Sequence, residues 1–191
     1  MTDQSGDKAN TIKGEDWAGE MGTKWLANLA RFEGMIAPIG AALLARADFQ
    51  SGERVLDIGC GGGGTTTGIA NALAPGGEGL GIAISPDLTA ASTKRASDAG
   101  VGNIRFMCAD ASTVQLPEAP FDRLFSRFGS MFFAEPHQAF ANLRSLLRPG
   151  ARIDLAVWAP PRDNLWMMEM MGVVRRHVDI PPAVPRAPGP F

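Results

Sequence analysis

The segment Val55-Leu56-Asp57-Ile58-Gly59-Cys60-Gly61-Gly62-Gly63-Gly64 joins an apolar, β-favouring run to a run of glycines. Gly59, Gly61 and Gly64 fit the pattern G-x-G-x-x-G, in which the missing side chains allow a tight turn and a close approach of a ligand to the backbone. Residues 65–73 are typical of the helix that follows such a turn. This order predicts a ligand site, although a glycine-rich turn without a ligand has the same pattern.

Strands and helices are expected to alternate along the chain. The expected strands are 55–58, 79–84, 104–109, 121–128 and 152–158. The expected helices are 65–73, a segment that begins at Pro86 and ends at Gly100, and 136–147. Strands that alternate with helices at this spacing form βαβ units, so we predict an α/β fold with a Rossmann-like, doubly wound parallel sheet of about five strands. Ligands of such sheets bind beyond the carboxyl ends of the strands.

Two helices are expected before the glycine turn. Large apolar side chains recur at helical spacing, at Trp25, Leu29, Phe32 and Ile36. Pro38 is typical of the first position of a second helix. These helices either pack beside the sheet or close over its ligand edge, and we expect Trp25 in the core.

The chain divides into three parts. Residues 1–15 are polar and typical of a flexible N-terminus, and 181–191 form a Pro-rich extended tail. Between them, 16–180 are expected to form a single domain that includes the N-terminal helices. Its last helix, 164–178, carries the methionine cluster 167–171, which we expect to face the core.

Composition narrows the class of protein. The chain has 191 residues, 45% hydrophobic and 20% charged, which is ordinary for one globular domain with a sizeable core. A net charge of −2 without a long basic run predicts a small-molecule partner and no nucleic acid. Cys60 and Cys108 form no disulfide or metal-ligand pattern, and no apolar run reaches the length of a membrane span. We therefore expect a cytoplasmic protein with no metal and no membrane partner.

Two carboxylates are expected at the ligand edge of the sheet. Asp57 lies at the end of the first strand and Asp110 follows the third, so both should reach the crevice beside the glycine turn. A dinucleotide dehydrogenase would use the same glycines, but its pyrophosphate would be repelled by a carboxylate. An amino group would be attracted instead. S-adenosylmethionine combines an amino-acid end with an adenosine end and fits this pattern.

Several motifs in order resemble one family. Segment 55–61 resembles the first motif of the class I S-adenosylmethionine-dependent methyltransferases, 121–129 their fourth, and 147–152 the turn into their fifth strand. The resemblance runs from about Trp17 to the C-terminus, and within the family it is strongest to the small-molecule enzymes of the ubiquinone/menaquinone-biosynthesis type. It implies S-adenosylmethionine-dependent methyl transfer to a small-molecule acceptor.

The resemblance implies roles at the methionine end of the cofactor. Gly59 and Gly61 would approach the methionine part, with the turn around Cys60 contributing backbone contacts. Asp57 would orient the amine directly or through water. Ser126 would offer its backbone carbonyl near the same amine.

It also implies roles at the adenosine end. Asp110 would accept a hydrogen bond from the adenine amino group and Ala111 would donate its backbone N–H to a ring nitrogen, although Asp110 also suits a turn cap. The end of the second strand, Ala83 and Ile84, would lie at the ribose. Members of the family usually carry an acid at the position of Ala83, and Asp87 is close in sequence but suits a helix start.

The C-terminal side departs from the family, whose sheet normally gains two strands after the fifth. The sequence predicts a sheet that lacks them, with strand 152–158 at an exposed edge. We expect one of three consequences: self-association through this edge, for example as a homodimer; coverage of the edge by 181–190; or low stability.

No obligatory catalytic side chain follows from the sequence, because methyl transfer mainly requires positioning. Glu135 and His137 are the candidate bases near the crevice, and both also suit a helix start. Segment 131–133 lines an acceptor pocket or belongs to the core. Three interpretations stay open: an active small-molecule methyltransferase, a non-catalytic cofactor-binding protein, and a fragment of a longer methyltransferase.

Overall fold

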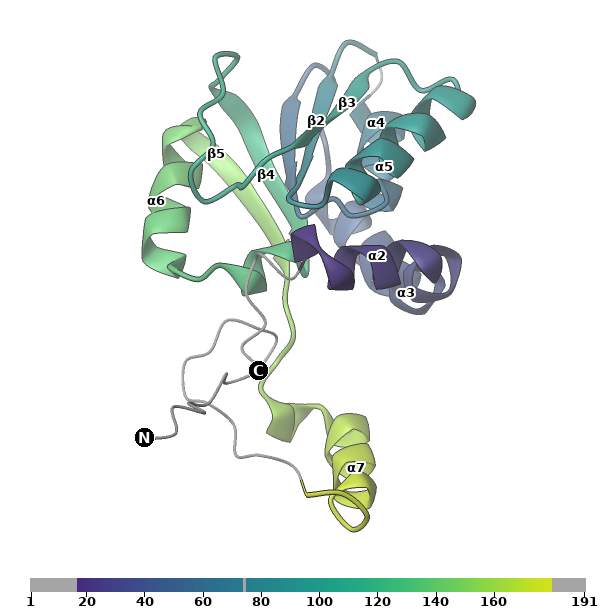
Figure 1. Cartoon of the computed structure of the whole chain (residues 1–191). Coiled ribbons are helices and arrows are strands. Elements are labelled where there is room, and N and C mark those ends of the chain that lie inside the picture. The colour runs from purple at the N-terminus through teal and green to yellow at the C-terminus, as the bar shows by residue number, and fades with distance from the viewer. Residues whose placement is uncertain (1–16, 74, 180–191) are drawn as a thin grey trace, which may run out of the picture.

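The computed structural model describes residues 17–73 and 75–179 and contains a five-stranded parallel sheet. The strands are β1 Arg54–Ile58, β2 Glu78–Ala83, β3 Ile104–Cys108, β4 Phe121–Arg127 and β5 Leu147–Ala156. Their order in the sheet is β3-β2-β1-β4-β5, which places β1 at the centre (Figure 1). The α/β fold with a Rossmann-like parallel sheet of five strands is thereby confirmed.

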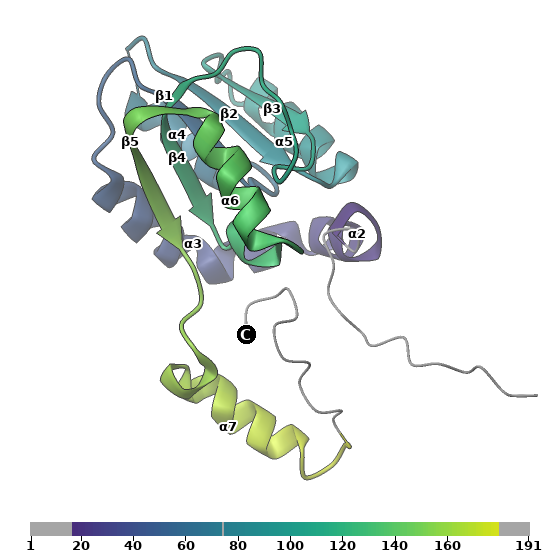
Figure 2. The same ribbon diagram turned by 90° about the vertical axis from the view of Figure 1, so that its left-hand side faces the viewer.

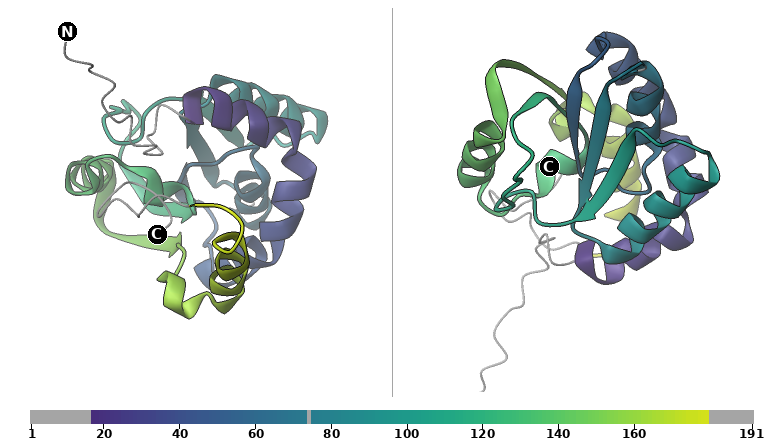
Figure 3. Two further views of the ribbon diagram at one scale, coloured as in Figure 1. Left: turned by 60° about the horizontal axis from the view of Figure 1, so that its bottom comes forward. Right: turned by 90° about the horizontal axis from the view of Figure 1, so that it is seen from above.

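Helices cover both faces of the sheet. They are α2 Glu20–Ala27, α3 Leu29–Ala47, α4 Gly64–Leu73, α5 Pro86–Asp98, α6 Pro136–Ser145 and α7 Leu165–Val174, with short 3-10 turns η1 Gly129–Phe132 and η2 Pro161–Asp163. Seen along the sheet, α6 lies on one side and α4 and α5 lie on the other (Figure 3, right). Helices α2 and α3 run past the carboxyl ends of the strands (Figures 1 and 2). They therefore help to form the ligand edge.

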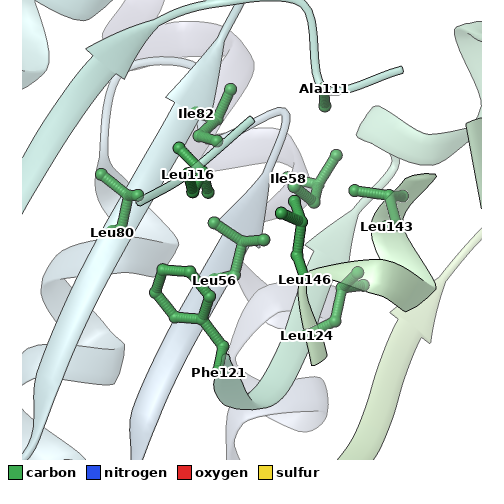
Figure 4. Close-up of a cluster of buried hydrophobic side chains, with 10 residues drawn as sticks. All are labelled: Leu56, Ile58, Leu80, Ile82, Ala111, Leu116, Phe121, Leu124, Leu143 and Leu146. Carbon is green, nitrogen blue, oxygen red and sulfur yellow. The ribbon is translucent and has the colours of Figure 1, made fainter. Parts of the chain in front are cut away.

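Two apolar clusters hold the helices to the sheet. The larger lies on the α6 side and joins β1, β2 and β4 to that helix through the residues Leu56, Ile58, Leu80, Ile82, Ala111, Leu116, Phe121, Leu124, Leu143 and Leu146 (Figure 4). The smaller lies on the other face and contains the residues Ala47, Val55, Ile69, Leu73 and Phe125. Because successive side chains of a strand point to opposite faces, β1 and β4 contribute to both clusters.

A buried ion-pair network fixes β5 against β4. The guanidinium of Arg123 pairs with Glu53 at 2.9 Å and with Asp154 at 2.9 Å, and it also donates to the carbonyl of Ala47 at the end of α3. Arg123 and Asp154 are buried, and removing one partner of a buried pair costs about 3–5 kcal/mol. The network thus sets the position of β5, whose continuation reaches the ligand edge.

The break between the N-terminal helices is not at Pro38, as the sequence predicted, but at Asn28, which ends α2 and begins α3. Pro38 lies inside α3. A proline in a helix removes the hydrogen bond to the carbonyl four residues earlier, here that of Gly34. Both residues are exposed, so water can satisfy this carbonyl and the helix continues.

The expectation that the methionine cluster faces the core is wrong. Helix α7 has no buried residue, and in Figures 1 and 2 it lies apart from the sheet, beyond the carboxyl ends of the strands. Leu147 also differs from expectation, because it begins β5 instead of ending α6. A register shift between Phe121 and Arg123 accommodates the turn at Pro149-Gly150 within this strand.

Two expectations lie outside the described residues: the flexible terminus 1–15 and the Pro-rich tail 181–191. Within the described residues, no helix combines the length and the apolar character that crossing a membrane requires.

Candidate functional site

A cleft of about 840 Å³ lies at the carboxyl ends of the strands. The glycine turn, the end of β2, the loop after β3, the end of β4 with η1, and helices α2 and α3 all line it. The size fits a ligand of nucleoside dimensions, since small-molecule sites occupy about 300–1,000 Å³. Of the nine residues expected to bind the cofactor, seven line this cleft: Gly59, Cys60, Gly61, Ala83, Ile84, Asp110 and Ala111.

The two motif glycines have different roles. Gly59 (φ +70°) faces the chain itself, because a Cβ there would lie 2.5 Å from the Cα of Gly129. At Gly61 (φ +54°) a Cβ would meet only the Trp25 Nε1, at 4.0 Å. Gly59 is therefore required by the packing of two loops, whereas Gly61 leaves its backbone open to the cleft.

Asp57 lies beneath the glycine turn and does not line the cleft. Its Oδ2 accepts hydrogen bonds from the hydroxyls of Thr65 at 2.9 Å and Thr66 at 2.7 Å, both in the first turn of α4. Its Oδ1 is buried and has no hydrogen-bond partner among the described residues. Burial raises the pKa of Asp57 to about 6, against the lowering effect of the two hydroxyls and of Arg127.

Ser126 joins β4 to the glycine turn. Its hydroxyl donates to the carbonyl of Ile58 at 2.7 Å and accepts from the backbone N–H of Ser130 at 3.2 Å. The side chain is completely buried and is not part of the cleft lining. This bond holds η1 beside the turn, where Gly129 meets Gly59.

The end of β2 presents apolar side chains to the cleft. Ala83 is 7% exposed and lines it, as do Ile84 and Ser85. The Ser85 hydroxyl caps α5 by accepting from the backbone N–H of Leu88 at 3.3 Å. Asp87 is exposed on α5 and does not line the cleft.

The loop after β3 places Asp110 and Ala111 side by side in the cleft wall. Asp110 Oδ1 accepts from both the backbone N–H and the hydroxyl of Ser112, at 2.8 Å and 2.7 Å. This is a turn of the Asx type, so one carboxylate oxygen of Asp110 caps the turn, the alternative role that the sequence left open. Oδ2 forms no hydrogen bond with the described residues.

The N-terminal helices close one side of the cleft. Trp25 lines it, contrary to the expectation of a core position, and its ring lies 5.6 Å from Trp17 and 4.9 Å from Phe32. Glu33 also lines the cleft and is tied to the glycine turn by Arg95, whose Nη1 donates to the Glu33 carboxylate at 2.7 Å and to the Gly62 carbonyl at 2.9 Å. Helix α3 is therefore fixed directly over the turn.

The opposite side of the cleft is apolar and aromatic. Phe128 stacks on Trp158 with ring centroids 4.8 Å apart and an interplanar angle of 10°. The backbone N–H of Trp158 donates to the sulfur of Met131 at 3.3 Å. Phe128 has φ +67°, a conformation that costs a non-glycine residue about 1–2 kcal/mol. The stack and the bond from the Phe128 N–H to the Ala156 carbonyl, at 2.9 Å, hold this conformation.

Only one of the two candidate bases lines the cleft. Glu135 lines the cleft at the start of α6, together with Gln138. His137 is exposed and does not line it.

Sequence reasoning missed several cleft residues, above all Arg127, Phe128 and Trp158. Arg127 directly follows Ser126 at the end of β4, so a charged residue at a strand end was available as a signal. For Phe128 and Trp158 no local signal exists, because their contact joins the ends of two strands that are distant in sequence.

Known proteins share this sequence pattern and this fold. The model of a family described as "Methyltransferase domain" matches residues 55–150, half of the chain. Nocamycin O-methyltransferase of Saccharothrix syringae is 30% identical over 65% of this chain and 44% of its own length. Aklanonic acid methyltransferase of Streptomyces sp. (strain C5) is 34% identical over 61% of this chain and 53% of its own. A ubiquinone/menaquinone biosynthesis C-methyltransferase of Pseudomonas aeruginosa is 31% identical over 61% and 46%.

Among solved structures, a SAM-dependent methyltransferase from Aquifex aeolicus matches with a TM-score of 0.59 at 18% identity, over 76% of this chain and 82% of that one. This likeness concerns the fold. The chain spans about half the length of the curated relatives named above.

Proposed function

This chain belongs to the class I S-adenosylmethionine-dependent methyltransferases, and we propose that it binds S-adenosylmethionine in the cleft beside Gly61 and transfers its methyl group to a small-molecule acceptor. The observation that carries the proposal is the open space at Gly61, where a Cβ would meet only Trp25 at 4.0 Å. At Gly59 the corresponding space is filled by Gly129, whereas the space at Gly61 belongs to the cleft.

The residues present fit the cofactor. Within the described part of the chain, one buried oxygen of Asp57 beneath the turn and the Oδ2 of Asp110 in the cleft wall have no hydrogen-bond partner. Negative charge at these two places suits the ammonium of the amino-acid end and the amino group of adenine. Bound S-adenosylmethionine supplies the methyl group on a positively charged sulfur, which is the reactive centre of the reaction.

The chain's own residues mainly position the reactants. Gly61 lets a ligand lie against the backbone, and Asp57 acts as a negative charge from below. The Glu33–Arg95 pair fixes α3 over the turn and so limits the access of water to this part of the cleft. Preorganised contacts of this kind lower a barrier without a general base.

The acceptor is proposed to be a small molecule with an apolar, planar body. The stacked rings of Phe128 and Trp158 and the side chains of Met131 and Phe133 offer such a surface. The names of three relatives refer to nocamycin, to aklanonic acid and to ubiquinone/menaquinone biosynthesis, which agrees with this class. Glu135 is the ionisable group beside this surface and would accept a proton from a hydroxyl or an acidic carbon.

Calorimetry with S-adenosylhomocysteine tests the cofactor site with two matched variants. Gly61→Ala and Gly76→Ala both place a methyl group at a positive φ, +54° and +89°, and so carry similar backbone strain. Only Gly61→Ala adds an atom inside the cleft, since nothing lies within 4 Å of a Cβ at Gly76. We expect one site in the wild type, binding weakened at least about tenfold by Gly61→Ala, and wild-type affinity in Gly76→Ala. Tighter binding of a nicotinamide dinucleotide would contradict the proposal.

A second candidate is cofactor binding without turnover. It is favoured by the exposed apolar surface of α7, which no described element covers, because a site completed by a further segment would be expected to cover such a surface. Turnover of S-adenosylmethionine with a panel of phenolic, quinone and polyketide acceptors separates the two candidates, because only the enzyme converts the bound cofactor.

A further inference from the structure

Arg127 is an arginine at the ligand edge that has no anionic partner among the described residues. It is the last residue of β4 and lines the cleft. Its Nε is buried and has no hydrogen-bond partner, and no carboxylate among the described residues lies within 4.0 Å of its guanidinium. By contrast, the buried Arg123 is paired with Glu53 and Asp154, and Arg95 is paired with Glu33. Arg127 therefore holds unused donors.

Its position is built by the fold. The side chain passes beneath α3 at Gly40, where a Cβ would lie 2.8 Å from Nη1 and 3.4 Å from Cδ. A side chain at position 40 would occupy the space of the guanidinium. Burial lowers the pKa of Arg127, while the negative charges of Asp57 and Glu33 act against this effect, so the guanidinium lies within electrostatic reach of both acids.

The charges of the cleft are otherwise negative. Among the described residues that line it, Arg127 is the one cation, beside the three acids Glu33, Asp110 and Glu135. A carboxylate that enters this cleft is repelled by the acids and has a single charged group to pair with. An arginine presents several donors in a planar fork that matches a carboxylate.

The amino-acid end of the cofactor carries such a carboxylate, one carbon away from its ammonium. We infer that Arg127 binds the carboxylate of this amino-acid end, opposite the negative charge of Asp57, an inference that rests on the proposed function. The neighbouring charges of Arg127 and Asp57 then complement the two charges of a zwitterion.

The test compares two ligands that differ at this end. S-adenosylhomocysteine carries the amino-acid end, and 5′-methylthioadenosine keeps the nucleoside but lacks it. Arg127→Met removes the charge at similar volume. We expect calorimetry to show binding of S-adenosylhomocysteine weakened about ten- to a hundredfold, the effect of one charge-assisted bond, and binding of 5′-methylthioadenosine changed less than about twofold. Arg127→Lys should lose less than Arg127→Met, because it keeps the charge but not the fork.

Gly40→Ala tests the same contact without changing Arg127. Its methyl group would displace the guanidinium, while alanine in place of glycine stabilises a helix by about 1 kcal/mol. Gly34→Ala on the same helix is the matched control, because nothing lies within 4 Å of a Cβ there. We expect Gly40→Ala to lower the preference for S-adenosylhomocysteine over 5′-methylthioadenosine at unimpaired stability, and Gly34→Ala to leave this preference unchanged.

The outcomes separate the two proposals. A wild-type protein that binds neither ligand contradicts the proposed function. A wild-type protein that binds both, with a preference that Arg127→Met and Gly40→Ala leave unchanged, overturns only the role of Arg127. If Arg127→Met weakens the binding of both ligands equally, the role of Arg127 is also overturned, because this result would indicate a structural role.

Discussion

Strand β1 and helix α7 are both apolar in sequence, but four of the five β1 residues are buried and none of the α7 residues is. Strand β1 lies between β2 and β4 and has helices on both faces, whereas α7 lies apart from the sheet (Figures 1 and 2). Apolar composition thus leads to burial only where the chain itself supplies the neighbours. The sheet around β1 is covered by the chain's own helices, whereas α7 presents apolar surface.

The largest expected effect is on the free energy of unfolding, when one large apolar side chain in each region is replaced by alanine. Leu56 on β1 is 0% exposed and Met170 on α7 is 54% exposed. Leu56→Ala should destabilise the protein by about 2–5 kcal/mol because it leaves a cavity in the larger cluster. Met170→Ala should change the free energy of unfolding by less than about 0.5 kcal/mol. Urea denaturation measures both, and a similar loss in the two variants would show that α7 is packed in solution.

The second effect is a pH dependence confined to the buried region. The pKa of Asp57 is raised from 3.8 to about 6 by burial, so the folded state holds this proton more tightly than the unfolded state. The resulting stabilisation is complete below pH 3.8 and is lost as the pH rises through about 6. It amounts to about 3 kcal/mol for a shift of about two pKa units.

Asp57→Asn is the control for this pH dependence, because it keeps the shape and removes the titration. Other acids act in the opposite direction: at Asp122, bonds from Arg54 and Arg148 outweigh burial and lower the pKa. The quantity to compare is therefore the difference in unfolding free energy between wild type and Asp57→Asn from pH 4 to pH 7. A difference that stays constant over this range would contradict the raised pKa.

The parallel sheet and most of the cleft lining at its carboxyl edge were predictable from the sequence. Local patterns, namely an apolar run, a glycine turn and a helix start, specify β1, α4 and α5, and alternation specifies the parallel sheet. Asp110 was expected at the ligand edge because strand ends of a parallel sheet meet there, Ala111 was expected from the family resemblance, and both line the cleft. The same reasoning placed Asp57 at this edge, where it lies under the turn.

What escaped prediction depends on contacts between distant segments. The requirement for Gly59 comes from Gly129, seventy residues later, and not from the cleft. The space for Arg127 depends on Gly40 of α3, which no pattern within β4 could indicate. The exposure of α7 was not predicted either, because its apolar pattern does not show whether another segment of the chain covers it.

A smaller effect is expected from adding a carboxylate at position 83, in the wall of the cleft. Ala83 lines the cleft, and the family resemblance leads us to expect an acid at this position that would bind the ribose hydroxyls. Ala83→Asp should tighten the binding of S-adenosylhomocysteine by about tenfold, or ~1.4 kcal/mol, if the cleft keeps its shape. The gain is smaller where water already bridges the hydroxyls. Calorimetry measures the change.

Asp87→Ala is the matched test, because Asp87 is exposed on α5 and does not line the cleft. This variant should keep wild-type affinity. Loss of binding in Asp87→Ala, with no gain in Ala83→Asp, would move the ribose contact to the start of α5.

The smallest effect on stability, and the clearest on assembly, is expected at the open side of the molecule. In the described chain no strand pairs with the outer edge of β5, and Ile153 on this strand is 49% exposed. An edge strand with apolar side chains pairs readily with another copy, whereas a lysine there opposes pairing. We therefore expect the wild type to self-associate with rising concentration in sedimentation velocity. Ile153→Lys should reduce this association and change the free energy of unfolding by less than about 0.5 kcal/mol.

Met170→Lys distinguishes the two exposed surfaces. Association that persists in Met170→Lys and is lost in Ile153→Lys assigns the contact to β5, and the reverse result assigns it to α7. A wild type that stays monomeric at high concentration would show that neither surface recruits a second copy.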